Sequence, residues 1–216
     1  MQKQEITQKV LDCGVVAVIR ASSVEMAEKV ATACAEGGIV GLELTFTVPG
    51  AQEVIAHLAA NKEAKYVVGA GTVLDAPTAR TAILAGAKFI VSPSFDKGTA
   101  EICNAYQIPY IAGCLTPTEV LTAMKAGVDL VKIFPGDVVG PKYIKDLHGP
   151  FPQGNFLPSG GVSVENAAEW IKNGAAAVSA GSSLIAPAKK GDFEGVKKNA
   201  SEFVAVVKAA REALAK

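Results

Sequence analysis

The sequence is poor in aromatic side chains and in charge. Aromatic residues fill 6% of the 216 positions, with a single tryptophan, and charged residues fill 19%, below the quarter that is usual in soluble domains. The 21 basic and 21 acidic side chains cancel. The composition therefore predicts a tight aliphatic core, and no basic stripe or basic amphipathic helix indicates a nucleic-acid or membrane partner.

Residues that commonly bind metals are also scarce. The four cysteines form no C-x-x-C pair, and there are only two histidines, so we expect no metal site, no cofactor and reduced, structural cysteines. The N-terminus is polar and lacks an apolar signal region, and no apolar run is long enough to span a membrane. These absences predict a cytoplasmic protein. The cysteines are Cys13, Cys34, Cys103 and Cys114.

Short β-rich runs alternate along the chain with longer helical stretches. Near-continuous apolar strands that alternate with helices predict a parallel sheet covered by helices. The expected strands are Val15–Ile19, Gly41–Thr45, Tyr66–Gly69, Phe89–Val91, Tyr110–Ala112, Leu130–Ile133, Phe156–Leu157 and Ala177–Ser179.

The helical stretches carry start and stop signals. The runs 22–25 (SSVE) and 116–119 (TPTE) each have the spacing of a capping box, in which a hydroxyl and a glutamate satisfy backbone N–H groups. Glycines suited to a left-handed helix C-terminus precede several strands. These glycines are Gly37, Gly38, Gly86, Gly127 and Gly174.

The repeated unit predicts an α/β fold, a single (β/α)8 TIM barrel over residues 1–216 with a short N-terminal helix near Gln4–Asp12. No linker or change of composition divides the chain. A doubly wound open sheet is the alternative architecture. An open sheet would bind a ligand at one switch point, whereas a barrel gathers active groups at the carboxyl ends of many strands.

Lys132 lies in the apolar run 129–136 (DLVKIFPG), which has the pattern of a buried strand. A buried ammonium group is costly unless it is paired or loses its proton. A neutral lysine is a nucleophile for ketones and aldehydes, so the position favours Schiff-base chemistry. The alternative is a lysine at a strand end whose charge reaches water.

Glu43 also lies within an apolar strand, in the run 40–46 (VGLELTF). Burial raises the pKa of a carboxyl group, which suits proton transfer near neutrality. A structural ion pair is the alternative. Both residues fall where a barrel places its active groups, together with Arg20, Thr72, Pro93 and Phe134 at other strand ends.

Two glycine-serine turns follow the last two expected strands, at 159–161 (SGG) and 181–183 (GSS). Barrel enzymes often bind phosphate there with backbone N–H groups. The run 69–72 (GAGT) lacks the spacing of a dinucleotide loop and has no acidic ribose partner. The turns therefore indicate a phosphate group and not a dinucleotide.

Five segments together resemble the 2-keto-3-deoxy-6-phosphogluconate (KDPG) aldolases, also called 4-hydroxy-2-oxoglutarate (KHG) aldolases. The resemblance covers essentially the whole chain. The lysine-Phe-Pro segment with an upstream strand glutamate is its specific part, since glycine turns are common. The segments are Gly41–Thr45, Gly69–Val73, Ser92-Pro93, Val131–Pro135 and Pro158–Gly161.

The resemblance implies a metal-independent, class I carbon-carbon lyase that works as a homotrimer of (β/α)8 barrels. It implies Lys132 as the Schiff-base lysine and Glu43 as the proton carrier, with Thr72 and Arg20 on the pyruvyl carboxylate. We also expect Pro93 and Phe134 to contact substrate. The residues implied for the phosphate and nearby hydroxyl groups are Ser159, Gly160, Gly161, Gly181 and Ser182.

Two positions depart from the family pattern. Some members carry an arginine for the carboxylate where this chain has Thr47, so we expect Arg20 to supply the guanidinium without help from Thr47. Many members have threonine where this chain has Ser159, and the lost methyl group could shift the choice of aldehyde.

The sequence thus predicts cleavage of KDPG to pyruvate and glyceraldehyde 3-phosphate, and of 4-hydroxy-2-oxoglutarate to pyruvate and glyoxylate. One alternative is a sugar-phosphate isomerase or epimerase on the same barrel, with Glu43 as its base and no Schiff base. The other is a non-catalytic or engineered assembly built on an aldolase scaffold, which would have no use for a buried Lys132.

Overall fold

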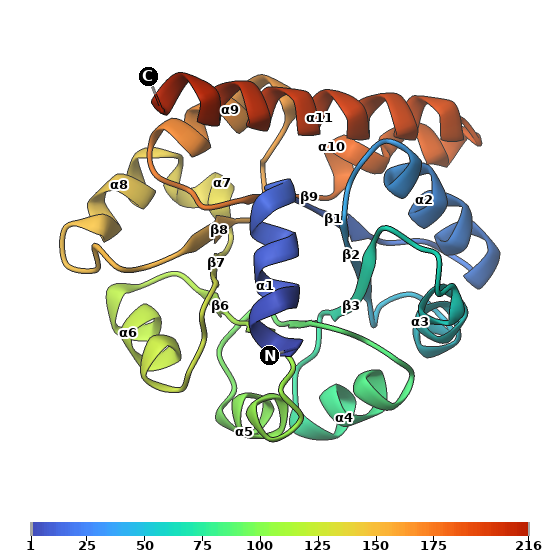
Figure 1. The fold of residues 1–216 in the computed structure, drawn as a ribbon, viewed down its shortest axis with the longest axis horizontal. Helices are drawn as coiled ribbons and strands as arrows, with labels where there is room; N and C mark the ends of the chain where they lie inside the picture. The colour runs from blue at the N-terminus through green and yellow to red at the C-terminus, as the bar shows by residue number, and fades with distance from the viewer. Residues whose placement is uncertain (1, 216) are drawn as a thin grey trace.

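Short parallel strands lie inside a ring of helices (Figure 1). The structure is a computed structural model, and residues 2–215 are described. The strands are β1 (Val15–Ile19), β2 (Gly41–Thr45), β3 (Val67–Gly71), β4 (Ile90–Val91), β5 (Tyr110–Ile111), β6 (Gly113–Cys114), β7 (Val131–Ile133), β8 (Phe156–Pro158) and β9 (Val178–Ala180). The helices are α1 (Gln2–Cys13), α2 (Val24–Glu36), α3 (Ala51–Ala60), α4 (Ala76–Leu84), α5 (Lys97–Ala105), α6 (Pro117–Lys125), α7 (Gly136–Val139), α8 (Lys142–His148), α9 (Val164–Lys172), α10 (Ser182–Ile185), the 3-10 turn η1 (Ala186–Lys190) and α11 (Phe193–Leu214).

The strands form two curved parallel sheets. One has the order β5-β4-β3-β2-β1-β9 and the other has the order β6-β7-β8. The predicted α/β class and parallel pairing are confirmed, with β1 and β2 at their expected bounds. The predicted single ring differs from these two sheets, so the described residues establish an α/β fold whose parallel sheet curls into a half-barrel.

The two sheets meet at two junctions. At one junction, β5 and β6 are separated only by Ala112, whose carbonyl accepts a hydrogen bond from the Lys132 amide of β7 at 2.9 Å. At the other junction, the Ala176 amide donates to the Phe156 carbonyl at 2.9 Å, and Ser159 and Ser179 form an isolated parallel bridge. Backbone hydrogen bonds therefore connect the edges of the two sheets.

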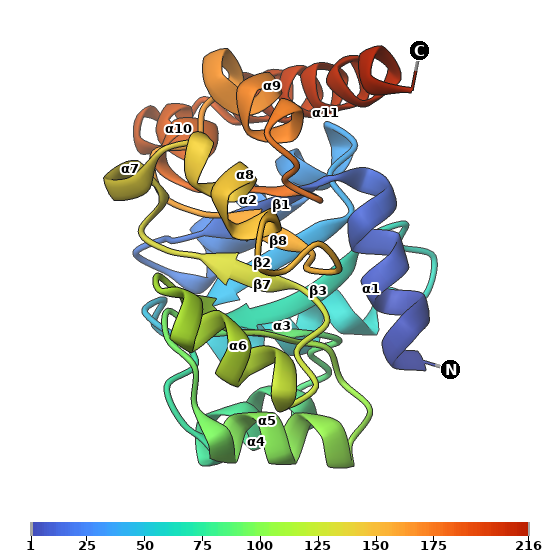
Figure 2. The ribbon, with the colours of Figure 1, turned by 90° about the vertical axis from the view of Figure 1, so that its left-hand side faces the viewer.

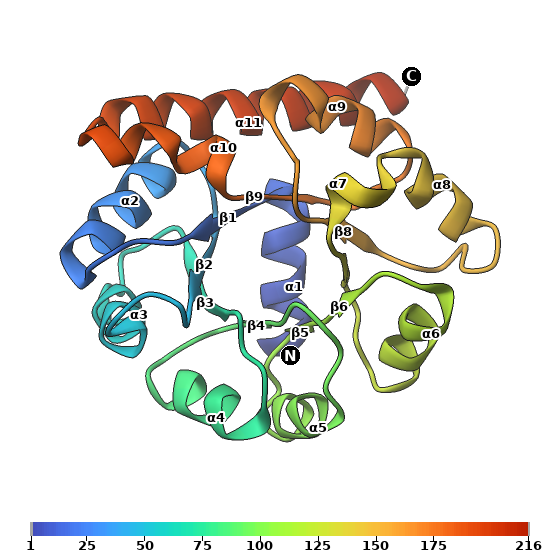
Figure 3. The same cartoon turned by 180° about the vertical axis from the view of Figure 1, so that it is seen from behind.

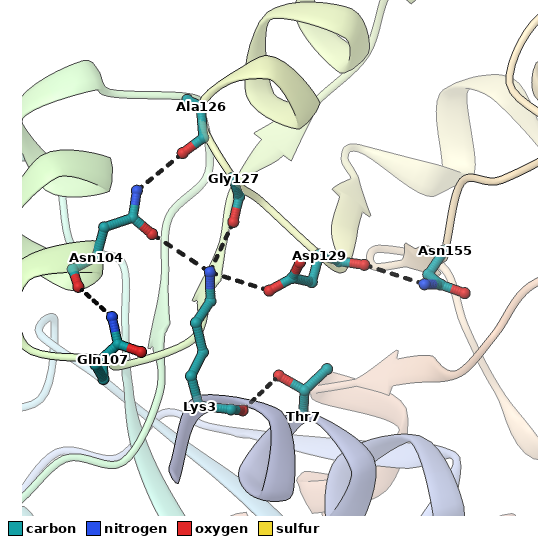
Figure 4. Close-up of polar contacts among 8 residues, drawn as sticks. All are labelled: Lys3, Thr7, Asn104, Gln107, Ala126, Gly127, Asp129 and Asn155. Carbon is teal, nitrogen blue, oxygen red and sulfur yellow. Dashed lines mark hydrogen bonds and ion pairs between the residues drawn. The ribbon is translucent and has the colours of Figure 1, made fainter. Parts of the chain in front are cut away.

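Helix α1 lies across the amino ends of the strands, in front of the ring in Figure 1 and behind it in Figure 3. Lys3, on α1, makes three polar contacts that hold the helix against this end of the fold (Figure 4). Its Nζ lies 3.0 Å from Asp129 Oδ2 and donates to the Gly127 carbonyl at 2.8 Å and to Asn104 Oδ1 at 3.3 Å. One side chain thus connects α1 to the last turn of α5 and to the loop that follows α6.

Inward-facing side chains form a layer of apolar groups beneath the middle of the ring. Because strand side chains alternate between faces, residues two positions apart face the same side. Two α1 residues close the layer from below, and all of its members are 5% exposed or less. The layer, called the lower layer below, comprises Ile6, Val10, Val16, Phe89, Val91, Ile111, Leu130, Leu157 and Ala177.

The helix signals of the sequence are mostly confirmed. The Thr116–Glu119 capping box is present, with Glu119 accepting from the Leu115 and Thr116 amides at 2.8 Å. The capping box expected at Ser22–Glu25 is wrong, because Ser23 caps α2 by accepting from the Met26 amide. Four of the five expected stop glycines have the positive φ that favours glycine, and these are Gly38, Gly86, Gly127 and Gly174.

The helices cover the outside of the strands. Helix α11 lies beside α9 (Figure 2) and also packs against α2. The four cysteines are free, as predicted, and burial raises the pKa of the Cys34, Cys103 and Cys114 thiols to about 12.

None of the helices within residues 2–215 combines the length and apolar character that crossing a bilayer requires.

Candidate active site

Four polar side chains and two glycines, with one valine and one proline, occupy the interior positions directly above the lower layer. Each lies two residues further along the chain than a position at the level of the lower layer. Six of the eight are on strands, where side-chain alternation turns them to the inside as well, and the other two follow the ends of β4 and β8. The set, called the upper layer below, comprises Val18, Glu43, Gly71, Pro93, Gly113, Lys132, Ser159 and Ser179. The predicted nucleophile and the predicted proton carrier therefore occupy one level of the fold.

Glu43 is the buried carboxylate of this layer. It is 1% exposed, and neither carboxylate oxygen has a hydrogen-bond partner within residues 2–215. Burial raises the pKa of Glu43, and the nearby positive charges of Lys132 and Arg20 oppose that shift without cancelling it. The group is thus held toward its protonated form, the state that can donate a proton at a pH where an ordinary glutamate has lost it.

Gly71 on β3 makes room for the Glu43 side chain. A Cβ atom built on Gly71 would meet Glu43 Cγ at 2.5 Å and Cδ at 2.6 Å, closer than real Cβ contacts come. The φ of Gly71 lies outside the positive range, so its backbone imposes no need for glycine. A glycine is therefore needed here because the Glu43 side chain occupies the space that a Cβ atom would fill.

Lys132 on β7 is 6% exposed, so the predicted burial is confirmed. Its Nζ lies 5.0 Å from the centroid of the Phe134 ring. The β7 register places Lys132 between Gly113 on β6 and Leu157 on β8. With Gly113 on one side, the lysine has a neighbour without a side chain, and its amine reaches the cavity above the upper layer.

That cavity, of about 370 Å³, opens at the carboxyl ends of the strands. Of the eleven predicted site residues, ten line it, and Glu43 is the exception because it lies below the surface of the cavity. The ten are Arg20, Thr72, Pro93, Lys132, Phe134, Ser159, Gly160, Gly161, Gly181 and Ser182.

Thr72 has an unusual backbone at the edge of this cavity. Its φ is 55°, in the left-handed region that β-branched residues rarely adopt. Such a conformation costs free energy of order 1–3 kcal/mol and concentrates at functional sites. The backbone thus supports a functional role for the Thr72 side chain.

The two glycine turns are held together by hydrogen bonds. Gly160 and Gly161 have φ values of 95° and 68°. The Ser159 carbonyl accepts from the Gly136 amide at 2.7 Å, and the Asn166 side chain donates to the Gly161 carbonyl at 2.8 Å. Ser183 Oγ, from the second turn, donates to the Val162 carbonyl at 2.6 Å. These contacts fix both turns beside the cavity.

Arg20 and Thr47 meet at the rim of the cavity. Arg20 Nη1 donates to Thr47 Oγ1 at 3.0 Å. The sequence did not indicate this contact. The threonine supplies no charge, but its oxygen holds the guanidinium.

Two further polar residues of the cavity were not predicted from the sequence. Ser179 on β9 is 1% exposed, and its hydroxyl has no hydrogen-bond partner within residues 2–215. Only its strand position could have indicated it, two residues before Gly181. Lys189 is exposed and also lines the cavity. Its position depends on η1, which the sequence pattern did not predict.

Within residues 2–215, no three His, Cys, Asp or Glu side chains lie close enough to hold a metal ion together. The cavity combines a buried amine, a carboxyl group with a raised pKa, a guanidinium and two backbone turns. A site of this kind defines an α/β protein that can carry out amine chemistry on an anionic carbonyl compound.

Comparison with known proteins gives the family. A sequence model of the KDPG and KHG aldolase family matches residues 6–199. The chain belongs to this family of carbon-carbon lyases. A 2-dehydro-3-deoxy-phosphogluconate aldolase of Treponema pallidum (strain Nichols) is 34% identical to it over 186 residues, which cover 84% of this chain and 88% of the relative.

Two solved structures are similar to the chain over most of its length. KDPG aldolase from Legionella pneumophila, with pyruvate captured at low pH as a covalent carbinolamine intermediate, has a TM-score of 0.80 and 28% identity, covering 87% of this chain and 92% of its own. A cube-shaped protein cage, designed by fusing symmetric oligomeric domains, has a TM-score of 0.87 and 28% identity, covering 94% of this chain and 74% of its own.

Proposed function

We propose that the protein cleaves KDPG to pyruvate and glyceraldehyde 3-phosphate, and 4-hydroxy-2-oxoglutarate to pyruvate and glyoxylate. The observation that carries the proposal is the placement of Lys132 and Glu43 in one interior layer under a cavity with two glycine turns. Family membership supports the reaction class.

Lys132 is the proposed nucleophile. Its neutral amine attacks the ketone carbon, which forms a carbon–nitrogen bond and a carbinolamine, and loss of water leaves an iminium ion. Cleavage of the C3–C4 bond sends its electron pair into the iminium, so the pyruvyl half becomes an enamine while the C4 hydroxyl loses its proton and becomes the aldehyde. Protonation of the enamine and hydrolysis release pyruvate and restore the amine.

Glu43 is the proposed proton carrier, acting through a water molecule. Each turnover moves protons for carbinolamine breakdown, for the C4 hydroxyl and for the enamine carbon. A carboxyl group with its pKa raised by burial keeps its proton to a higher pH than an ordinary glutamate and can donate it in one step and take one back in the next. A positive charge on Lys132 lowers the pKa of Glu43 against the larger effect of burial, so the two side chains are close enough to interact. This interaction supports a shared reaction centre.

The substrate is proposed to span the cavity from Thr72 and Arg20 to the two turns. Arg20 and the Thr72 hydroxyl hold the pyruvyl carboxylate, with Pro93 and Phe134 against the carbon chain. The turns offer backbone N–H groups and hydroxyls to the phosphate. Lys189 also lines the cavity and offers a further basic side chain to an anionic substrate. The turn residues are Ser159, Gly160, Gly161, Gly181 and Ser182.

Ser179 is proposed as a further substrate contact. A buried hydroxyl without a partner is costly. Ser179 lies in the upper layer, two residues before the Gly181 turn and bridged to Ser159. A substrate attached to Lys132 with its phosphate at the turns must carry its C4 hydroxyl past this position. We therefore assign Ser179 to that hydroxyl group.

We also infer one domain over residues 1–216, in which the two sheets form a closed (β/α)8 barrel. The backbone contacts at both junctions support closure. A homotrimer is proposed from the family resemblance, and the symmetric oligomeric domains of the similar designed cage support an oligomeric state. Light scattering at several concentrations tests the trimer. A cytoplasmic location stays a prediction.

The direct test is an assay of pyruvate release from both substrates, with and without a metal chelator. We expect cleavage of both and no loss with chelator, because the amine supplies the electron sink. Loss of activity with chelator would contradict the mechanism. Isomerisation of a sugar phosphate without pyruvate release would favour the isomerase alternative, and absence of either reaction would favour a scaffold.

A further inference from the structure

Two threonines after the catalytic glutamate connect the buried strands to Arg20. Thr45 is fully buried at the end of β2, and Thr47 is exposed two residues further on. Arg20 Nη1 lies 3.0 Å from Thr47 Oγ1, Thr47 Oγ1 lies 2.8 Å from Thr45 Oγ1, and Thr45 Oγ1 lies 3.1 Å from the Ile19 carbonyl oxygen. The contacts form one line from the rim to the backbone of β1.

The groups at the two ends of this line determine which oxygen donates and which accepts in each hydrogen bond. A backbone carbonyl can only accept, so the single Thr45 hydroxyl proton is donated to Ile19. Thr47 must then donate its own proton to the Thr45 oxygen. A guanidinium can only donate, so the free lone pairs of Thr47 face Arg20. The line therefore presents Arg20 with an acceptor and not with a competing donor.

We propose that Thr47 is a positioning residue, which holds the Arg20 guanidinium at the cavity mouth in the orientation that meets the pyruvyl carboxylate. This inference rests on the proposed function. An exposed arginine otherwise samples many rotamers, and fixing it in advance lowers the cost of binding. The hydrogen bond uses Nη1 and leaves the other guanidinium N–H groups free for an anion.

The first test compares Thr47→Val with Thr47→Ser on both substrates. Valine keeps the shape but removes the oxygen, so KM for each substrate should rise about three- to tenfold, in line with the loss of one ordinary hydrogen bond at an exposed position. The kcat should change much less, because the reacting groups are untouched. Serine keeps the oxygen and should recover most of the wild-type KM. Thr81→Val, which removes an exposed hydroxyl bonded to the Pro77 carbonyl on α4, is the control.

The second test repeats Thr47→Val in an Arg20→Met background. Because Thr47 acts through Arg20, the second change should add nothing to the KM of the arginine variant. A further increase in KM would overturn the inference in favour of a structural role. So would an unfolding temperature that Thr47→Val lowers by the same amount with Arg20 present and with Arg20 replaced.

The outcomes separate the inference from the proposed function. If the wild-type protein cleaves both substrates and Thr47→Val matches it, the positioning role is wrong and the function stands. If the wild-type protein cleaves neither substrate, the proposed function fails, and the role of Thr47 in carboxylate binding fails with it.

Discussion

The two interior layers of the fold are built by the same strands and have opposite chemistry. The lower layer is apolar and is closed by α1. The upper layer, two residues further along, contains a buried carboxyl, a buried amine and two buried serines, with polar atoms that lack partners within residues 2–215. The strands thus gain stability from one layer and accept a desolvation cost in the next.

Two glycines on β3 show the difference at the level of single residues. A Cβ atom on Gly69 would meet the Phe89 ring of the lower layer, at 2.5 Å from Cδ2 and Cζ. A Cβ atom on Gly71 would meet the Glu43 side chain of the upper layer. Gly69 therefore makes room for an aromatic ring of the core, and Gly71 makes room for the reactive carboxyl group.

The largest effect should come from removing the amine of the upper layer. Lys132→Ala should abolish cleavage of both substrates, because no other group can form the covalent intermediate in the proposed mechanism. Pyruvate release measures the loss, and circular dichroism should show a folded protein. Retention of measurable cleavage at near wild-type rate would remove Lys132 from the mechanism.

Glu43→Gln should lower turnover by roughly a hundred- to ten-thousand-fold, the usual range for a general acid–base residue. Pyruvate binding should change much less. A variant with ordinary turnover would make Glu43 a structural residue.

The same variant should also change the pH dependence of stability. Burial holds the pKa of folded Glu43 above the ordinary value of 4.5, so its stabilising contribution is complete below pH 4.5 and is lost as pH rises through the folded value. Glutamine cannot ionise. The free energy of unfolding of Glu43→Gln, relative to wild type, should therefore increase as pH rises from 4.5 through that value. A constant difference across urea titrations from pH 4 to pH 8 would contradict the raised pKa.

The two β3 glycines offer a matched pair of substitutions. Gly69→Ala should lower the unfolding free energy by about 1–3 kcal/mol, typical of overpacking. Gly71→Ala should instead reduce turnover, because the new methyl group displaces the Glu43 side chain. Turnover and urea midpoints for both variants make the comparison. Equal losses of stability with equal turnover would erase the distinction between the layers.

Ser179→Ala should have a smaller effect. Losing the proposed contact to the C4 hydroxyl should reduce kcat/KM about tenfold, as expected for one hydrogen bond. Discrimination between KDPG and its C4 epimer should also weaken. Stability should stay level or rise, because a buried hydroxyl without a partner is removed. Unchanged kinetics on both epimers would make the serine a packing residue.

The smallest effect should follow from loosening α1 below the lower layer. Lys3→Met removes the ion pair with Asp129 and two hydrogen bonds, which should cost about 1 kcal/mol of unfolding free energy. Lys9→Met, which breaks only an exposed pair with Glu5, should cost less. The kcat of both should equal wild type. A loss of turnover in Lys3→Met would show that the two ends of the fold are coupled.

Much of this arrangement could be predicted because strand alternation is a local property. The positions of Glu43 and Lys132 inside apolar runs were enough to predict burial, and both are buried. The helix ends could be predicted for a similar reason, because the positive φ at a helix C-terminus favours glycine and glycine can be read from the sequence.

The contacts that join distant segments could not be predicted in this way. Nothing in the sequence pairs Thr47 with Arg20, because that contact depends on the register between β1 and β2. Ser179 resembles any small strand residue until the cavity is visible. The capping box at Ser22–Glu25 failed because α2 begins one residue later than its pattern indicated, which moved Met26 to the position expected for the glutamate.

The central claim is that the buried amine of the upper layer forms a covalent bond with the keto acid. Borohydride reduction of the wild-type protein with pyruvate, followed by intact mass measurement and peptide mapping, tests it most directly. The account predicts one adduct per chain, with the mass of a pyruvate less one water plus two hydrogens, on the peptide that contains Lys132. An adduct on Lys189 or on another lysine, or no adduct in a protein that cleaves its substrates, would contradict it.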